Sequence, residues 1–190
     1  MPDTPRLLGI SGSLRAQSFN TAILTSLAEA LGDRAEMTVF PLNDVPLYDQ
    51  DADTETPPAA VAALRRAIGE ADGIVFSSPE YNYGMSGVLK NALDWASRPY
   101  GKATLTGKPV LTITSSPAFT GGVRAQLDLN GTLVAIGARV VLGPQAVVAN
   151  VHEKVKDGRL VDEQARDFLI GRTDALLADI RVPNSSDREG

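Results

Sequence analysis

The stretch GSLRAQSFN, from Gly12 to Asn20, follows an apolar run at Arg6–Ser11 and leads into apolar residues at helical spacing. A strand, a short polar loop and a helix in this order are how α/β proteins hold a phosphate group. The N–H groups of the loop and of the first helical turn are free to donate hydrogen bonds, and the helix dipole favours an anion. We therefore predict a phosphate-binding loop at Gly12–Asn20.

Side chains in this loop add further donors. They are the hydroxyls of Ser13 and Ser18, the carboxamide of Asn20, and the guanidinium of Arg15, which can hold two phosphate oxygens at once. A structural interpretation competes, because Ser18 is also a good N-cap residue and Asn20 can simply lie exposed in the first helical turn. The spacing alone does not decide between the two.

The sequence also narrows the type of phosphate loop. A Walker A loop requires a Gly-Lys pair followed by Ser or Thr, and neither Lys102 nor Lys108 is followed by one. The dinucleotide motif is absent as well, since Gly9 and Gly12 have no third glycine at the start of the helix. These absences disfavour nucleoside triphosphate hydrolysis and suit a monophosphate, such as that of flavin mononucleotide (FMN).

Composition limits the class of protein. The chain has 190 residues, 43% of them hydrophobic, which suits one domain over residues 1–190 with a frayed polar tail at about 182–190. The formal net charge of −5 and the scattered Lys and Arg residues argue against a nucleic-acid footprint. No apolar stretch reaches the roughly 20 residues of a membrane span. Met1–Pro5 lacks signal-peptide features, so the expected compartment is the cytoplasm.

The chain contains no cysteine and one histidine, His152. Disulfides, a catalytic thiol, thiolate metal sites and a histidine metal cluster are therefore excluded, and redox chemistry must come from a bound organic cofactor. Asp44, Asp49, Asp51 and Asp53 lie among prolines and threonines, so we interpret them as a solvated connection and assign no metal.

Short apolar runs alternate with amphipathic stretches along the chain, which is typical of a parallel sheet covered by helices on both faces. Five strands fit a flavodoxin-like α/β sandwich of three layers, a fold type whose five-stranded parallel sheet has the order 2-1-3-4-5. The predicted strands are Arg6–Ser11, Met37–Phe40, Gly73–Ser77, Pro109–Ser115 and Arg139–Leu142. Apolar residues at helical spacing predict helices around Phe19–Leu31, Val61–Ile68, Leu89–Ala96, Val123–Ile136 and Ala165–Ile180.

Ligands of such sheets bind beyond the carboxyl ends of the strands, where the winding direction reverses. Three loops, Ser11–Asn20, Ser77–Gly87 and Ser115–Gly122, are therefore expected to share one site. In the second loop, two tyrosines and a methionine beside glycines offer flat, soft surfaces to a planar ring such as an isoalloxazine. Alternatively, its proline and glycines only turn the chain while the tyrosines anchor the loop.

Three motifs together resemble the NADPH-dependent FMN reductase family: GSLRAQSFN, PEYNYGMSGVLKNALDW from Pro79 to Trp95, and GKPV from Gly107. The resemblance covers about residues 8–148. It implies a flavodoxin-like fold, FMN as cofactor, and assembly into homodimers or homotetramers. The chain departs from the family at Gly84–Gly87, where many members carry a proline, although Ser86 can cap the following helix.

The resemblance also implies roles for individual residues. In the first loop the expected cofactor-binding residues are Ser13, Arg15, Ser18, Phe19 and Asn20. In the second loop they are Pro79, Glu80, Tyr81, Asn82 and Tyr83, which would line the isoalloxazine largely through backbone groups. Ser115 or Ser116, together with Gly121, would close the far edge. No side chain is assigned a catalytic role, and Arg124 and His152 are interpreted as surface or ion-paired groups.

The expected activity is hydride transfer from NADPH or NADH, through bound FMN, to a quinone, azo compound, free flavin or metal oxyanion. One exposed face used in turn by donor and acceptor predicts a ping-pong mechanism. The alternative is a flavodoxin-like electron carrier that binds FMN but turns over NADPH poorly, and a third possibility is a flavin-free scaffold whose loops bind a partner. The expected partners are a small-molecule acceptor and further copies of this chain, with no nucleic acid and no membrane.

Overall fold

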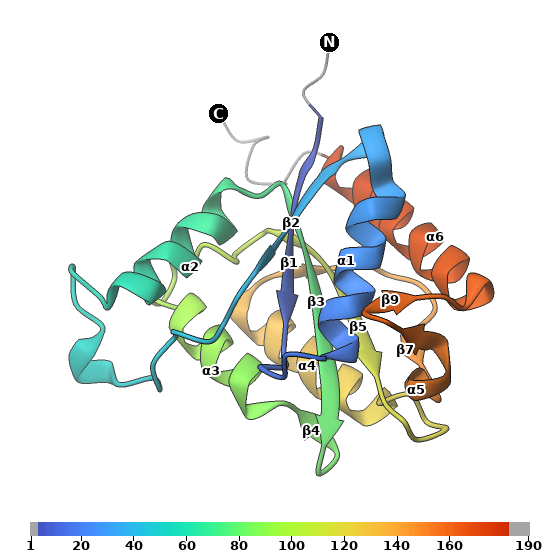
Figure 1. Ribbon diagram of the computed structural model, residues 1–190. Helices are drawn as coiled ribbons and strands as arrows, with labels where there is room; N and C mark the ends of the chain where they lie inside the picture. The colour runs from blue at the N-terminus through green and yellow to red at the C-terminus, as the bar shows by residue number, and fades with distance from the viewer. Residues whose placement is uncertain (1–3, 183–190) are drawn as a thin grey trace.

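A parallel β-sheet runs through the middle of the computed structural model, which describes residues 4–182 (Figure 1). Its main path has the strand order β2-β1-β3-β5-β6, which is the predicted order 2-1-3-4-5 when only the five predicted strands are numbered. Residues 183–190 of the predicted tail lie outside the described residues. The strands of this path are β1 (Arg6–Ser11), β2 (Glu36–Phe40), β3 (Gly73–Tyr81), β5 (Pro109–Ser115) and β6 (Arg139–Val140).

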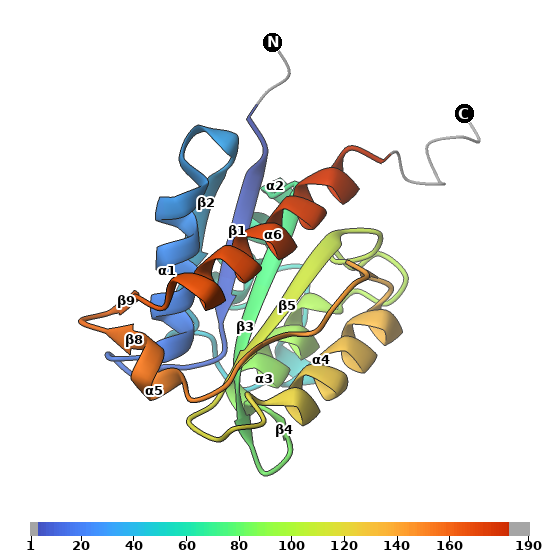
Figure 2. The same ribbon diagram turned by 90° about the vertical axis from the view of Figure 1, so that its right-hand side faces the viewer.

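Helices cover both faces of the sheet, so the three predicted layers are confirmed (Figure 2). They are α1 (Phe19–Leu31), α2 (Ala59–Glu70), α3 (Gly87–Ala96), α4 (Val123–Ile136) and α6 (Glu163–Ile180). Successive strand residues point to opposite faces. Leu7 and Val75 accordingly pack with α1 and α6 in one apolar core, whereas Leu8 and Ile74 pack with α2, α3 and α4 in the other. Two buried faces explain why the strands are apolar almost throughout.

The helix beginnings follow from capping residues in the sequence. The side chains of Ser18 and Ser86 accept hydrogen bonds from the backbone N–H groups of Thr21 and Leu89, each at 3.2 Å. These are N-caps of α1 and α3, so the prediction that Ser86 caps the helix after the second loop is confirmed.

The edge of the sheet differs from the prediction. The strand expected at Arg139–Leu142 ends at Val140, and pairing with β5 resumes only at β7 (Ala146–Val148). Gly143 between them has a φ of 136°, and Pro144 has no N–H to donate to a ladder. Together with the short β4 (Gly84–Met85), the split edge gives a seven-stranded sheet instead of the predicted five strands.

Two side chains replace ladder hydrogen bonds where the edge is broken. The buried carboxamide of Gln126, on α4, donates from Nε2 to the carbonyl oxygens of Thr112 (2.9 Å) and Ala146 (3.2 Å). From the opposite face, Arg172 of α6 donates to the carbonyl oxygens of Val141 and Leu142 at 3.2 and 3.1 Å. The break is therefore satisfied by side chains, as buried carbonyl groups require.

Several short elements were not predicted. They are the 3₁₀ helices η1 (Gly32–Arg34) and η2 (Gln50–Ala52), the helix α5 (Val151–Lys154), and the hairpin formed by β8 (Val155–Lys156) and β9 (Arg159–Leu160). The hairpin turns at Asp157 and Gly158, both with positive φ, and an Asp-Gly pair is a sequence signal for such a turn. Among residues 4–182, no helix combines the length and apolar character needed to cross a membrane.

Candidate functional site

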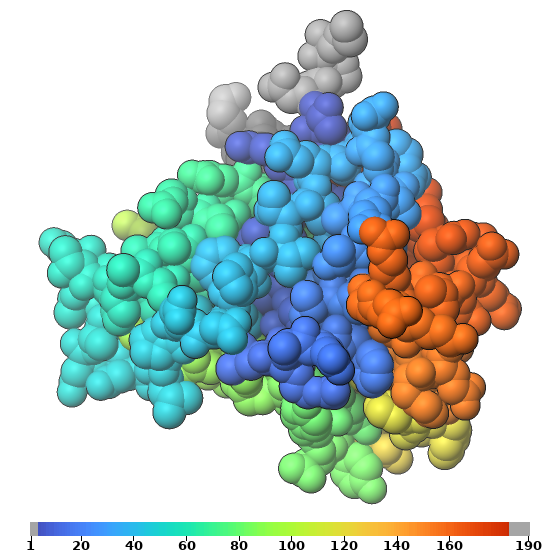
Figure 3. Space-filling model, in the orientation of Figure 1, coloured from blue at the N-terminus to red at the C-terminus, as the bar shows by residue number. Residues whose placement is uncertain are grey.

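The carboxyl ends of β1, β3 and β5 lie side by side. In the parallel register Ser11 pairs with Ser77, and Pro79 pairs with Ser115, so the three loops that follow these strands gather at one edge of the sheet. In Figure 3 the first loop, in dark blue, lies between the segment after β2 and the β8–β9 hairpin, with the second loop below it. The predicted convergence of the loops is confirmed.

Two grooves flank the first loop. One, of about 450 Å³, lies between this loop and the segment that follows β2, and its lining includes Ser13, Arg15 and Leu42. The other, of about 440 Å³, lies between the start of α1 and the β8–β9 turn. Arg15 lines both grooves, so its guanidinium can reach a ligand on either side.

The first loop presents a set of unused backbone donors. The N–H group of Gly12 donates to the carbonyl oxygen of Ser77 (2.8 Å), and those of Ser13 and Arg15 donate to nearby serine hydroxyls (3.4 Å each). By contrast, the N–H groups of Leu14, Ala16, Gln17, Phe19 and Asn20 donate to no acceptor among residues 4–182. The loop therefore carries a concentration of free donors at the positive end of α1.

The side chains of the first loop divide into two groups. Ser18 is buried and serves as the N-cap of α1, which is the structural role weighed for it. Arg15 is exposed, and its guanidinium carbon lies 5.6 Å from the centre of the Phe19 ring. Stacking on an aromatic face limits the rotamers of an arginine while leaving its N–H groups available.

Asn20, predicted to hold the phosphate, is buried, with 4% of its surface exposed. Its Oδ1 accepts hydrogen bonds from the hydroxyls of Ser77 (2.8 Å) and Ser115 (3.1 Å). It does not lie exposed in the first turn, which was the structural alternative. Instead it connects the start of α1 to the middle of β3 and to the last residue of β5.

The second loop is a tight hairpin extension of the sheet. β3 continues past the predicted end at Ser77 to Tyr81 and pairs in antiparallel fashion with β4. Asn82 and Tyr83 form the turn with φ values of 50° and 69°, as in a type I′ turn. Positive φ is uncommon for tyrosine, so contacts around the turn must hold Tyr83 in place.

Those contacts come from α4. The carboxylate of Glu80 accepts hydrogen bonds from the backbone N–H groups of Arg124 (3.0 Å) and Ala125 (3.1 Å), and Asp128 accepts one from Met85 (2.9 Å). The Glu80 side chain thus caps α4, whose N-cap residue is a glycine. Only its backbone is available for the ring-lining role predicted for it.

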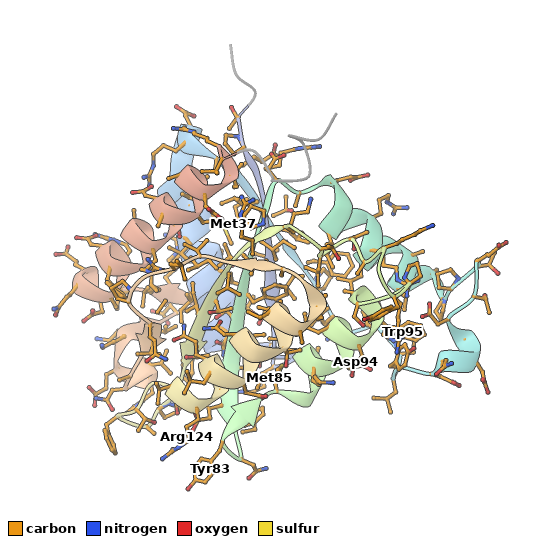
Figure 4. The ribbon with its side chains drawn as sticks, turned by 180° about the vertical axis from the view of Figure 1, so that it is seen from behind. Met37, Tyr83, Met85, Asp94, Trp95 and Arg124 are labelled. Atoms are coloured by element: carbon orange, nitrogen blue, oxygen red, sulfur yellow. The ribbon has the colours of Figure 1, made fainter. Side chains whose placement is uncertain are left out.

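Tyr83 and Arg124 form a stacked pair at the tip of the hairpin, with the guanidinium carbon 4.2 Å from the ring centre (Figure 4). Arg124 also lies 3.7 Å from Glu80. Met85, which was expected to offer a soft surface to a ring, is only 8% exposed and packs in the core beneath α3 and α4. The exposed aromatic side chains of this loop are Tyr81 and Tyr83.

The third loop is shaped by its own hydrogen bonds. The Ser116 hydroxyl accepts from the N–H of Ala118 (3.1 Å), and its backbone N–H donates to the carbonyl of Val148 (3.1 Å). Gly121 has a φ of 63°, and a Cβ there would lie 3.0 Å from a backbone nitrogen, so glycine is required. Phe119 projects from this loop at 84% exposure.

Sequence reasoning missed four hydroxyl groups that organise the site, those of Ser11, Thr21, Ser77 and Ser78. Thr21 donates to the Ser11 hydroxyl (2.9 Å), Ser77 donates to Asn20, and the Ser78 hydroxyl accepts from the N–H of Ser86 (3.2 Å). Small hydroxyl residues at the ends of apolar strands were the available signal. Ser11, Ser77 and Ser78 are buried and Thr21 is half-buried, and their hydrogen bonds connect the first loop to α1 and the second loop to α3.

One acidic residue of the connection after β2 is not solvated as expected. Asp53 pairs with Arg65 at 2.7 Å, and both side chains are mostly buried. Asp44, Asp49 and Asp51 are exposed, in agreement with the prediction. The ion pair anchors this segment against α2.

An open parallel α/β sheet with a donor-rich loop after its first strand, beside an aromatic hairpin, defines a flavodoxin-like mononucleotide-binding protein. The comparison with protein families is more specific. The model described as NADPH-dependent FMN reductase matches residues 5–153, and the chain belongs to this family of oxidoreductases.

Individual relatives agree with this assignment. The chain is 36% identical over 182 residues to an NAD(P)H-dependent FMN reductase from Pseudomonas aeruginosa, which covers 95% of this chain and 98% of the relative. It is 38% identical over 180 residues to the quinone reductase of Escherichia coli K12, covering 93% and 95% of the two chains. The solved structure of FerB, an NAD(P)H:(acceptor) oxidoreductase from Paracoccus denitrificans, superposes with a TM-score of 0.83 at 32% identity, covering 93% of this chain and 97% of FerB.

Proposed function

We propose that this oxidoreductase transfers hydride from NADPH or NADH through bound FMN to a small acceptor: a quinone, an azo compound, a free flavin or a metal oxyanion. FMN, when bound, supplies the redox chemistry by accepting a hydride and passing it on. The observation that carries the proposal is the set of unused N–H donors at Leu14, Ala16, Gln17, Phe19 and Asn20.

The first loop fits the phosphate of FMN. A phosphate dianion needs several donors and a positive field, and the loop combines free N–H groups with the N-terminus of α1 and the Arg15 guanidinium. No acidic residue occurs between Ser11 and Asn20 to oppose an anion. Ser13 and Asn20 complete the donor set proposed to hold the phosphate.

The second and third loops fit a planar ring and its reaction partners. Pro79 and Glu80 would border the ring through their backbone, while Tyr81, Tyr83 and Phe119 leave exposed aromatic faces at the same edge of the sheet. Flat aromatic acceptors would stack on such faces. Because donor and acceptor would have to use one open face in turn, we expect ping-pong kinetics.

We further propose that the chain assembles into homodimers or homotetramers. On α4, the exposed positions Leu127, Gly131 and Val134 follow one another at helical spacing and form an apolar stripe. A second copy of this chain would bury that stripe.

The direct test is the visible spectrum of the purified protein, followed by addition of NADPH and then of a benzoquinone in the absence of oxygen. We expect a bound flavin spectrum that bleaches with NADPH and recovers with the quinone, with parallel lines in double-reciprocal plots. FMN binding with slow NADPH turnover would instead indicate the electron-carrier alternative. A colourless protein that takes up no added FMN would refute the proposal.

A further inference from the structure

The amide of Asn20 is held by two serine hydroxyls from two different strands. Ser77 of β3 and Ser115 of β5 lie on adjacent strands, two register positions apart, and both donate to the same oxygen, Oδ1 of Asn20. Ser77 is fully buried, and Ser115 and Asn20 are 3% and 4% exposed. We call these three residues the amide clasp.

The clasp fixes which way the amide faces. An asparagine amide has an acceptor on one side and two N–H donors on the other, so two donors directed at Oδ1 leave Nδ2 on the opposite side. Nδ2 donates to no acceptor among residues 4–182, yet it is not completely buried. Nδ2 therefore keeps a little solvent access, on the side of the amide that faces away from the two serines.

The hydroxyl groups of Ser77 and Ser115 are not available to a ligand. Each uses its single proton on Asn20, and their burial keeps them behind the amide. A direct contact between the Ser115 side chain and a cofactor, as the sequence resemblance implied, would require giving up this hydrogen bond.

We infer that Ser77 and Ser115 are positioning residues that orient the Asn20 amide so that Nδ2 donates to the phosphate of the bound cofactor. This inference rests on the proposed function, because it assumes FMN at the first loop. Its consequence is selectivity: the clasp would favour FMN over riboflavin, which has the same ring but no phosphate.

The test measures dissociation constants of FMN and of riboflavin for the apoprotein, prepared by gentle removal of flavin. For the double variant Ser77→Ala/Ser115→Ala we expect the dissociation constant of FMN to rise about tenfold, because one oriented hydrogen bond to a charged group is lost. The dissociation constant of riboflavin should change less than twofold. Asn20→Asp keeps an acceptor for both hydroxyls but turns a carboxylate oxygen toward the phosphate. It should therefore weaken FMN binding more than Asn20→Ala does.

A double-mutant cycle separates positioning from direct contact. If the serines act through Asn20, adding both serine substitutions to Asn20→Ala should change the FMN dissociation constant less than twofold. Additive effects would overturn the inference, and so would equal weakening of FMN and riboflavin. Should the double serine variant fold poorly, Ser115→Ala alone provides the same comparison.

Ser26→Ala is the matched control. Ser26 is also buried on α1, where its hydroxyl accepts from the N–H of Leu160 (2.9 Å), away from the three loops. Its removal should leave the ratio of the two dissociation constants unchanged. A wild-type protein that binds neither flavin would refute the proposed function, whereas a ratio of FMN to riboflavin dissociation constants that stays at the wild-type value in the clasp variants would refute only the clasp.

Discussion

Gly12 illustrates at the scale of one residue how tightly the loops are joined. A Cβ at this position would lie 2.8 Å from the Ser86 hydroxyl, 3.2 Å from Cβ of Leu89 and 3.3 Å from the Ser78 hydroxyl. The hydroxyl of Ser86 is committed to capping α3 and cannot easily move aside. Glycine is needed here for close approach between the first and second loops.

Gly12→Ala should lower the free energy of unfolding by about 1–3 kcal/mol, because it overpacks this contact. Urea denaturation would measure the change. Gly9→Ala, in β1, is the matched control: the nearest atom to its added Cβ is the mobile end of Met37, at 2.9 Å, so the cost should be smaller. Equal losses in the two variants would contradict the role given to Gly12.

Arg15→Ala should weaken FMN binding by about 1.5–3 kcal/mol, or roughly 10- to 150-fold, because a charge-assisted contact with phosphate is lost. Fluorescence titration of the apoprotein measures this change. Arg66→Ala, which removes another exposed arginine from α2, should have no effect on FMN binding. An unchanged affinity in Arg15→Ala would remove Arg15 from the site.

At the scale of elements, Gln126 compensates for the broken edge of the sheet. Gln126→Leu should lower the free energy of unfolding by about 1–3 kcal/mol, since two buried carbonyl oxygens would lose their donor. Thermal or urea unfolding measures the loss. The same substitution at the exposed Gln164, on α6, should be nearly neutral. A neutral Gln126→Leu would mean that the break is satisfied in another way.

Lys108 joins the end of α2 to the start of β5 by donating to the carbonyl oxygens of Gly69 (3.2 Å) and Ala71 (2.5 Å). Burial lowers the pKa of Lys108 below its ordinary value of 10.5. Between the lowered pKa and 10.5, the unfolded chain therefore binds more protons at this position than the folded chain does. The contribution of Lys108 to stability should rise with pH across that window.

Comparison with Lys108→Met isolates this effect, because the other titrating groups are shared. As pH is raised toward 10.5, the difference in unfolding free energy between wild type and variant should shift in favour of wild type. Urea denaturation at several pH values provides the measurement, and a shift in the opposite direction would show that the folded state does not penalise the charged form.

At the scale of the whole molecule, the exposed stripe on α4 predicts self-association. Light scattering after gel filtration should give a mass about two or four times that of the 20.1 kDa chain. Leu127→Glu combined with Val134→Glu should shift the protein toward the monomer, because a charge would then have to be buried in the interface. Leu47→Glu, at another exposed apolar position, should leave the mass unchanged. A monomeric wild type would refute the assembly.

Much of the molecule followed from local sequence patterns. β1 and β5 begin and end where the apolar runs predicted, and α4 has its predicted bounds Val123–Ile136. The predicted end of the edge strand at Leu142 was wrong, because Val141 and Leu142 continue an apolar run in the sequence. The chain instead leaves the sheet before Gly143, and side chains from α4 and α6 supply the hydrogen bonds at this break. The roles of the predicted cofactor-binding residues remain predictions.

The sequence by itself determined the order of strands and helices, the position of the donor-rich loop and the family, because periodicity, capping residues and contiguous motifs are local properties. The tertiary structure alone decided that Asn20 meets Ser77 and Ser115, which are 57 and 95 residues away, and that Glu80 caps α4, 44 residues further along. Such pairs depend on strand register and on the packing of helices against the sheet. Strand register and helix packing produce no periodic pattern in the sequence, because each of these contacts involves single residues that come together only when the core has formed.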